Sequence, residues 1–128
     1  MVLREIMRIT IGGLRMLKAL HDDVRRQTID FLAEMQMEEG GLRANTRIPI
    51  ADLLSTFTGS LTLMDLEALD QIQVAAAGQY VGSLEFAEGG LRGAAWDEAR
   101  DVEYTFYGLG SLAILGTLSH GAPAAEKP

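Results

Sequence analysis

Two acidic residues open a predicted helix near the end of the chain, in Asp101-Val102-Glu103-Tyr104-Thr105. Carboxyl groups can donate or accept a proton in a reaction, so Asp101 and Glu103 are the candidate catalytic residues. The alternative is structural, because an Asp at the N-cap and an acid in the first turn both stabilise the positive end of a helix. Asp52, at the start of an earlier predicted helix, is in the same way a candidate substrate contact or a plain cap.

Two arginines and several aromatic residues could bind a substrate. Arg43 and Arg92 each follow a Gly-Gly-Leu sequence, and a guanidinium group can hold two phosphate oxygens. Either arginine could instead fasten its loop to a neighbouring acid or carbonyl. Aromatic rings can stack on an apolar ligand or attract a cation, although most such rings fill a core or pack helices together. The aromatic candidates are Phe57, Trp96, Tyr104, Phe106 and Tyr107.

The sequence offers no metal-ligand pattern. It contains no cysteine, and its two histidines, His21 and His120, lie far apart. The pair Asp22-Asp23 suits helix capping, since the further acids of a metal–diphosphate motif are missing. We therefore expect no metal site, and in particular no zinc.

An internal repeat positions these residues. One segment, Glu39-Gly40-Gly41-Leu42-Arg43, recurs 49 residues later as Glu88-Gly89-Gly90-Leu91-Arg92. The same offset relates three further pairs of identical residues: Asp52 and Asp101, Thr56 and Thr105, and Phe57 and Phe106. A fixed period of this length is typical of repeat architectures. The first predicted helix shares the register, because Thr10 and Gly13 precede Thr56 and Gly59 by 46 residues.

Apolar periodicity, acidic caps and glycine stops predict five helices. We expect them over 3–20, from Asp22 to the Gly40-Gly41 stop, from Asp52 to Leu63, over Leu66–Phe86, and from Asp101 to Leu118. The first, third and fifth carry the glycines and should form an inner layer, with the second and fourth outside. Residues 1–118 would form one domain, and 119–128 a disordered tail.

Composition restricts the class of protein. The chain has 128 residues, which suits a single domain, and a net charge of −7, which disfavours nucleic acid and anionic membranes as partners. No run approaches the roughly 18 to 20 apolar residues that span a bilayer, and the N-terminus does not read as a signal peptide. We therefore expect a soluble, cytoplasmic protein.

Two stretches carry a family resemblance: Phe31-Leu32 through Gln36 to Gly40-Gly41-Leu42, and Tyr104-Thr105-Phe106-Tyr107-Gly108-Leu109. Over residues 3–118 the chain resembles the prenyltransferase and squalene-cyclase repeat family. The resemblance implies an all-α fold, an α/α toroid whose inner helices surround an apolar cavity for an isoprenoid. Five helices would form an arc, so a second copy or a complementary subunit would close the cavity.

The motifs of that family match only in part. Protein prenyltransferase β subunits hold zinc with an Asp, a Cys two residues later and a His; Asp52 matches the Asp, but Leu54 and Tyr104 stand in the other places. Zinc-dependent protein prenylation is therefore not expected. Terpene cyclases carry an Asp-x-Asp-Asp-Thr sequence whose middle acid protonates the substrate. In this chain the middle acid would correspond to Glu103, and Tyr104 replaces the last acid.

The resemblance thus predicts an isoprenoid-processing protein or subunit, prenyltransferase-like or terpene-cyclase-like. Glu103 and Asp101 would supply acid chemistry, Arg43 and Arg92 would bind an isoprenyl diphosphate, and Mg²⁺ would enter only with that substrate. The alternative is a repeat module without catalysis that binds an apolar ligand or a partner protein.

Overall fold

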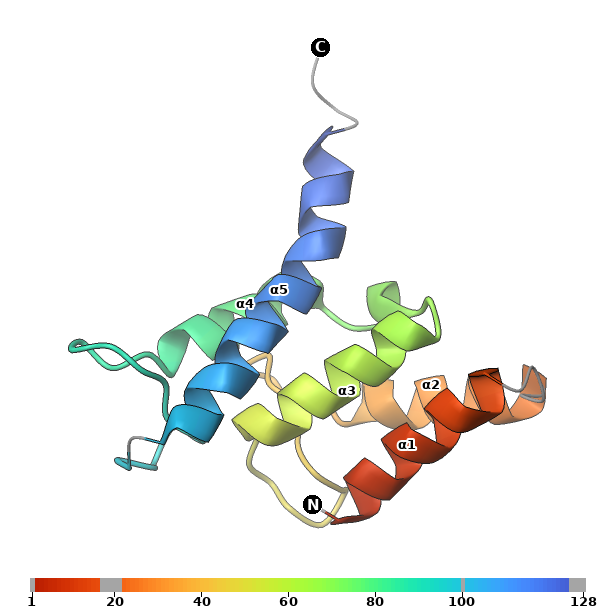
Figure 1. Ribbon diagram of the computed structural model, residues 1–128, viewed down its shortest axis with the longest axis horizontal. Helices are drawn as coiled ribbons and strands as arrows, with labels where there is room; N and C mark the ends of the chain where they lie inside the picture. The colour runs from red at the N-terminus through yellow and green to blue at the C-terminus, as the bar shows by residue number, and fades with distance from the viewer. Residues whose placement is uncertain (1, 17–21, 100, 125–128) are drawn as a thin grey trace.

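The computed structural model describes residues 2–16, 22–99 and 101–124 (Figure 1). In these ranges it contains five α-helices and a short 3₁₀ turn, with isolated bridges but no strand. The elements are α1 (Val2–Met16), α2 (Asp22–Glu34), α3 (Leu53–Asp65), η1 (Leu69–Gln71), α4 (Val74–Ser83) and α5 (Val102–Ala124). The expected all-α fold is confirmed.

The helices form two layers. Figure 1 shows α1, α3 and α5 side by side, with α2 and α4 behind them. Contacts between elements agree, since α3 packs between α1 and α5, α2 packs on α3, and α4 packs on α5. The predicted alternation of inner and outer helices is therefore confirmed.

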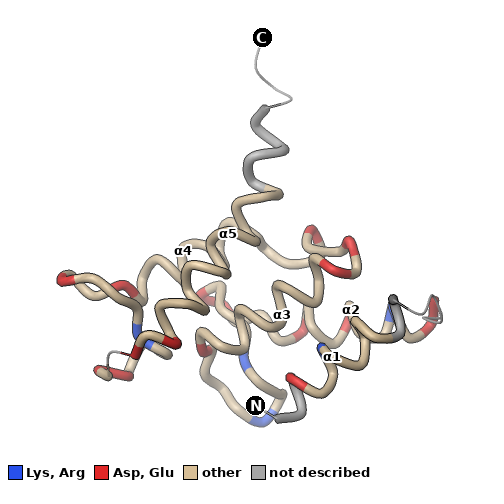
Figure 2. Tube along the Cα trace, viewed as in Figure 1, with Lys and Arg blue, Asp and Glu red and all other residues tan. Residues whose placement is uncertain are grey.

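The two inner helices that follow the loops carry very little charge. Asp65 is the one charged residue of α3, and Glu103 is the one charged residue of α5. Figure 2 shows the acidic and basic residues gathered on the loops, on α1 and on the outer helix α2 instead, whereas the outer helix α4 carries none. An inner layer of this kind presents apolar surface over most of its length, and Glu103 stands out in it.

Asp caps start α3 and α5 as predicted. The Asp52 carboxylate accepts hydrogen bonds from the backbone N–H and the hydroxyl of Ser55, both at 2.6 Å. The Asp101 carboxylate accepts one from the backbone N–H of Glu103 at 2.8 Å. These bonds satisfy N–H groups that have no partner inside the helix, so each Asp fixes where its helix begins.

The two Gly-Gly turns have the same construction. Gly41 O accepts from Met37 N at 2.8 Å in the first, and Gly90 O accepts from Phe86 N at 2.9 Å in the second. Gly40 has φ +107° and Gly89 has φ +104°, a region that residues with a Cβ rarely adopt. The glycines therefore reverse the chain from an outer helix toward the next inner helix.

Some predicted boundaries differ from the structure. The fourth helix, expected over Leu66–Phe86, is wrong in extent: it spans only Val74–Ser83. Leu66, Leu69 and Ile72 are buried in the connection before it, and Glu67 has φ +56°, so this apolar stretch turns into the core rather than extending a helix. Helix α5 continues to Ala124, beyond the end expected near Leu118. Residues 17–20 of the first predicted helix and 125–128 of the predicted tail lie outside the described residues.

Within the described ranges, none of the helices is both long and apolar enough to cross a membrane.

Candidate functional site

A cleft of about 330 Å³ opens where the N-terminal ends of α3 and α5 meet the loop between α4 and α5. Five of the candidate residues line it: Asp52, Trp96, Glu103, Tyr104 and Tyr107. They come from three segments, and the packing of α3 against α5 brings them together. The cleft therefore brings together candidates of both kinds, acidic and aromatic.

A glycine lets the loop approach α5 closely. A Cβ on Gly93 would lie 2.6 Å from Cζ of Tyr104, so the loop backbone rests directly on this ring. Gly93 O also accepts a hydrogen bond from Leu53 N at 2.7 Å, which ties the loop to the first residue of α3. The wall of the cleft is thus fixed, while the Trp96 side chain remains 69% exposed at its edge.

The cleft is acidic. Asp52, Asp97 and Glu103 line it, and none of the lysines and arginines that the structure describes does. Burial, followed by the negative charges of Asp97, Asp101 and Glu103, raises the pKa of Tyr104. Burial and then the charge of Glu103, with a hydrogen bond to it, raise the pKa of Tyr107. Both phenols therefore keep their protons at neutral pH and can donate hydrogen bonds beside carboxylate acceptors.

An aromatic cluster continues from the cleft along the inner layer. The ring centroids of Phe57, Phe106 and Tyr107 lie 5.3 to 5.9 Å from one another. A Cβ on Gly110 would lie 2.6 Å from the Phe57 ring, so this glycine makes room for the cluster. Tyr107 belongs to both groups, and it joins the acidic cleft to an apolar aromatic surface.

The remaining candidates lie outside the cleft. The Arg92 guanidinium stacks over the Phe86 ring at 4.3 Å, and Arg43 donates to Thr46 O at 3.4 Å. Each arginine thus contacts its own loop, Arg43 through a carbonyl and Arg92 through an aromatic ring. Asp101 caps α5 and does not line the cleft.

Asp97 lines the cleft but is not among the sequence candidates. Its carboxylate accepts from Ala99 N at 2.9 Å. In the sequence, only its position directly after Trp96, in the loop that leads to the Asp101 cap, could have suggested a role in the site. This indication is weak, because acidic residues are common in such loops.

The described residues of the cleft do not include a matching set of zinc ligands. Leu54 presents hydrocarbon beside Asp52, where a thiolate would be needed. Among the residues described, no three His, Cys, Asp or Glu side chains are grouped so as to hold a metal ion.

The structure defines a class of protein: an α/α repeat in which Asp-capped inner helices follow Gly-Gly turns and share an apolar inner layer. The family model of the prenyltransferase alpha-alpha toroid domain matches residues 6–126, and the chain belongs to this family. It is also similar to a protein farnesyltransferase subunit beta of Pisum sativum, with 29% identity over 111 residues. The match covers 87% of this chain and 25% of that protein, so the chain spans about a quarter of that relative's length.

Proposed function

We propose that the chain is part of an isoprenoid-processing protein, prenyltransferase-like or terpene-cyclase-like, whose inner layer forms one wall of a cavity for an isoprenyl chain. The observation that carries this proposal is the continuity between the acidic cleft and the cluster of Phe57, Phe106 and Tyr107. The nearly uncharged surface of α3 and α5 suits an apolar chain. The relative's name contains farnesyl, so a farnesyl group is the first ligand to test.

Each polar group of the cleft has a role in this proposal. In a cavity closed around the apolar chain, Glu103 takes up a proton and acts as a neutral acid. Its O–H bond and the π bond of a substrate alkene then break, a C–H bond forms at one carbon, and a carbocation is left at the other. The rings of Tyr107 and Phe57 then attract that cation. Asp101 holds the first turn through the Glu103 backbone N–H and acts as a positioning residue.

The charge of the cleft constrains the form of the substrate. Three acidic side chains and, among the described residues, no cationic one line the walls, so we expect a diphosphate to enter only with Mg²⁺ and an uncharged isoprenoid to enter alone. In this proposal a complementary subunit or a second copy of the chain closes the cavity. Arg43 and Arg92 stay candidates for a diphosphate only if assembly rearranges their loops.

Trp96 gives a direct test, because it is the only tryptophan and lies at the edge of the cleft. Farnesol, and farnesyl diphosphate with and without Mg²⁺, are titrated while Trp96 fluorescence and the melting temperature are followed. We expect quenching and a rise of the melting temperature with farnesol, and with the diphosphate only when Mg²⁺ is present. No response to any of the three ligands contradicts the proposal.

Catalysis is tested separately with Glu103→Gln. This variant should retain ligand quenching of Trp96 and lose turnover of an isoprenoid by about 100-fold or more, because the proton donor is gone. Glu98→Gln is the matched control, since Glu98 is exposed in the neighbouring loop and does not line the cleft. Equal turnover in Glu103→Gln and Glu98→Gln would remove Glu103 from the reaction.

A second candidate function is protein binding without catalysis. It rests on an exposed apolar face of α5, where Val102 is 86%, Phe106 63% and Leu109 60% exposed. Large exposed apolar faces commonly mark protein contacts. Under this alternative none of the isoprenoids changes the melting temperature, and Leu109→Asp abolishes assembly measured by light scattering.

A further inference from the structure

The second repeat places side chains in the cleft that the first repeat lacks. At the offset of 49 residues that relates the two repeats, five residues that line the cleft differ in chemistry from their counterparts: Trp96 from Arg47, Asp97 from Ile48, Glu103 from Leu54, Tyr104 from Ser55 and Tyr107 from Thr58. The first repeat forms its loop and its inner helix without an aromatic ring or an acid at these positions. The fold of a repeat therefore does not require these side chains, and their meeting in one cleft points to a ligand.

Three aromatic rings line the cleft. Tyr104 and Tyr107 lie one helical turn apart on α5, and Trp96 lies on the loop before it. Because Trp96 is 69% exposed, much of its ring is available to a ligand. The face of an aromatic ring carries partial negative charge and attracts an organic cation, and the indole ring of tryptophan does so most strongly.

Carboxylates accompany these rings. Asp97 accepts a hydrogen bond from Ala99 N at 2.9 Å, and Tyr107 is hydrogen bonded to Glu103. These bonds hold acidic groups in place before a ligand arrives, so little freedom is lost on binding. Among the described residues, none of the lysines and arginines lines the cleft. Its rings and its carboxylates therefore favour the same kind of ligand, one with a positive charge.

The size of the cleft suits an organic cation. Its volume of about 330 Å³ is that of roughly ten water molecules at about 30 Å³ each. Among the described residues, no three His, Cys, Asp or Glu side chains are grouped closely enough to hold a metal ion. Carboxylates spread around a space of this size, with rings between them, instead suit an ammonium group that carries methyl or methylene groups.

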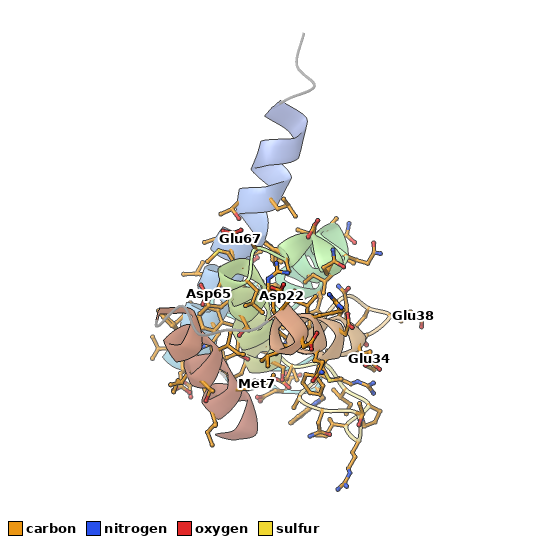
Figure 3. All side chains as sticks on the ribbon, turned by 90° about the vertical axis from the view of Figure 1, so that its right-hand side faces the viewer. Met7, Asp22, Glu34, Glu38, Asp65 and Glu67 are labelled. Carbon is orange, nitrogen blue, oxygen red and sulfur yellow. The ribbon has the colours of Figure 1, made fainter. Side chains whose placement is uncertain are left out.

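A second acidic region shows that acids alone do not define such a site. Figure 3 shows Asp22, Glu34 and Glu38 around α2, on another side of the molecule. A cleft of about 560 Å³ there is lined by acids together with Arg25 and Arg26, and by no aromatic residue among those described. In that region the protein supplies its own cations. The cleft beside α5 differs because it combines acids with rings.

We propose that the cleft formed by the start of α3, the start of α5 and the loop between α4 and α5 binds an organic ammonium group of a small molecule. The rings of Trp96, Tyr104 and Tyr107 contact its methyl or methylene groups, and the carboxylates of Asp97 and Glu103 face its charge. This inference goes beyond the proposed function and does not rest on it, because it concerns the charged group that the cleft accepts and not the apolar wall beside it.

A pair of ligands with the same shape tests the proposal. The whole chain is titrated with choline and with 3,3-dimethylbutanol, in which a carbon replaces the charged nitrogen, while Trp96 fluorescence and the heat of binding are followed. We expect choline to bind about 10-fold or more tightly than the neutral alcohol, since only choline is attracted by the rings and the carboxylates. Added salt should weaken the binding of choline and leave that of the alcohol unchanged.

Two variants locate the binding, and their melting temperatures confirm that they fold. Asp97→Asn should weaken the binding of choline by about 3- to 10-fold, because it removes a charge of the cleft while its amide oxygen can still accept from Ala99 N. Trp96→Leu should weaken it by about 10-fold in calorimetry, whereas Trp96→Phe, which keeps a ring, should weaken it less. Glu98→Gln is the matched control, since it removes the same charge from an exposed neighbour that does not line the cleft.

A methylated lysine of a protein offers the same chemistry as a small amine. A short peptide that contains trimethyllysine separates the two sources: tighter binding than that of choline would support the ammonium site and assign its natural ligand to a protein. Three results would overturn the proposal. The first is that choline at millimolar concentrations gives neither quenching nor heat. The second is equal binding of choline and the neutral alcohol.

The third is an equal loss of choline binding in Asp97→Asn and Glu98→Gln, since the attraction would then come from the net charge of −7 and not from the cleft. The titration with farnesol is independent of these outcomes. Binding of choline without a response to farnesol would support the ammonium site and contradict the isoprenoid wall, and the opposite result would do the reverse.

Discussion

Helices α3 and α5 have the same register in the repeat but very different surroundings. Leu53 and Leu63 of α3 are fully buried, whereas their counterparts in α5, Val102 and Leu112, are 86% and 41% exposed. Helix α5 and the loop before it cover this side of α3, as the hydrogen bond from Leu53 N to Gly93 O shows. No described element does the same for α5. Burial in this chain thus depends on the repeat that follows, and the residue type alone does not decide it.

The same comparison holds at the other edge of the inner layer. Helix α3 has a loop leucine on Gly59, α5 has one on Gly108, and α1 has an open Gly13. The middle inner helix is therefore the one that is covered on both sides. Helices α1 and α5, at the two edges of the inner layer, each present one face that a neighbouring repeat would cover in a longer array.

The largest expected effect is the difference between Leu53→Ala and Val102→Ala. Truncation of the fully buried Leu53 should lower the free energy of unfolding by about 3 kcal/mol, because it removes apolar contacts and leaves a cavity. Val102→Ala should change it by less than about 0.5 kcal/mol, since this side chain is already in solvent. Urea denaturation of both variants checks the difference, and similar losses would show that α5 is covered in solution.

A smaller effect is expected where Leu42 packs on Gly59 of α3, since a Cβ on this glycine would lie 2.6 Å from Cδ2 of Leu42. Gly59→Ala should cost about 1 to 2 kcal/mol, because the overpacking of Leu42 outweighs the gain in helix propensity. Leu42→Ala in the same chain should remove this cost, so the two substitutions should show a coupling in a double-mutant cycle. A Gly59→Ala variant that is more stable than the parent would mean that Leu42 is not tightly packed on Gly59.

Features set by local chemistry could be predicted from the sequence. An Asp before a helix and a glycine at positive φ act within a few residues, so the caps at Asp52 and Asp101 and the turn at Gly40 follow from the chain itself. The repeat then fixes the order of the layers, because equivalent positions must have equivalent neighbours.

Features set by distant contacts could not be predicted in the same way. The apolar stretch from Leu66 to Ile72 resembles helix in its composition, and only the packing of its side chains makes it a turn. Arg92 suits a phosphate and an aromatic ring equally well, and the position of Phe86 decides between them. Asp97 lines the cleft only because Gly93 lets its loop approach Tyr104.

The smallest effect at neutral pH is expected for Tyr80, which stands in the second repeat where Phe31 stands in the first. Its hydroxyl is buried with no hydrogen-bond partner among the described residues, and burial, followed by the charges of Asp52 and Glu39, raises its pKa well above the usual value. Tyr80→Phe should therefore raise the free energy of unfolding by about 1 kcal/mol at pH 7, because it removes a buried polar group that has no partner.

At alkaline pH the two side chains should differ clearly. The unfolded chain ionises Tyr80 near its ordinary pKa of about 10, whereas the folded chain keeps it neutral to higher pH, so the stability contributed by the neutral phenol is lost as the pH rises above about 10. The parent should lose about 1 kcal/mol more than Tyr80→Phe between pH 9 and pH 11, measured by urea denaturation at each pH. Parallel losses would mean that the phenol ionises in the folded chain as easily as in the unfolded one, and that the second repeat is less tightly closed around Tyr80 than its 5% exposure indicates.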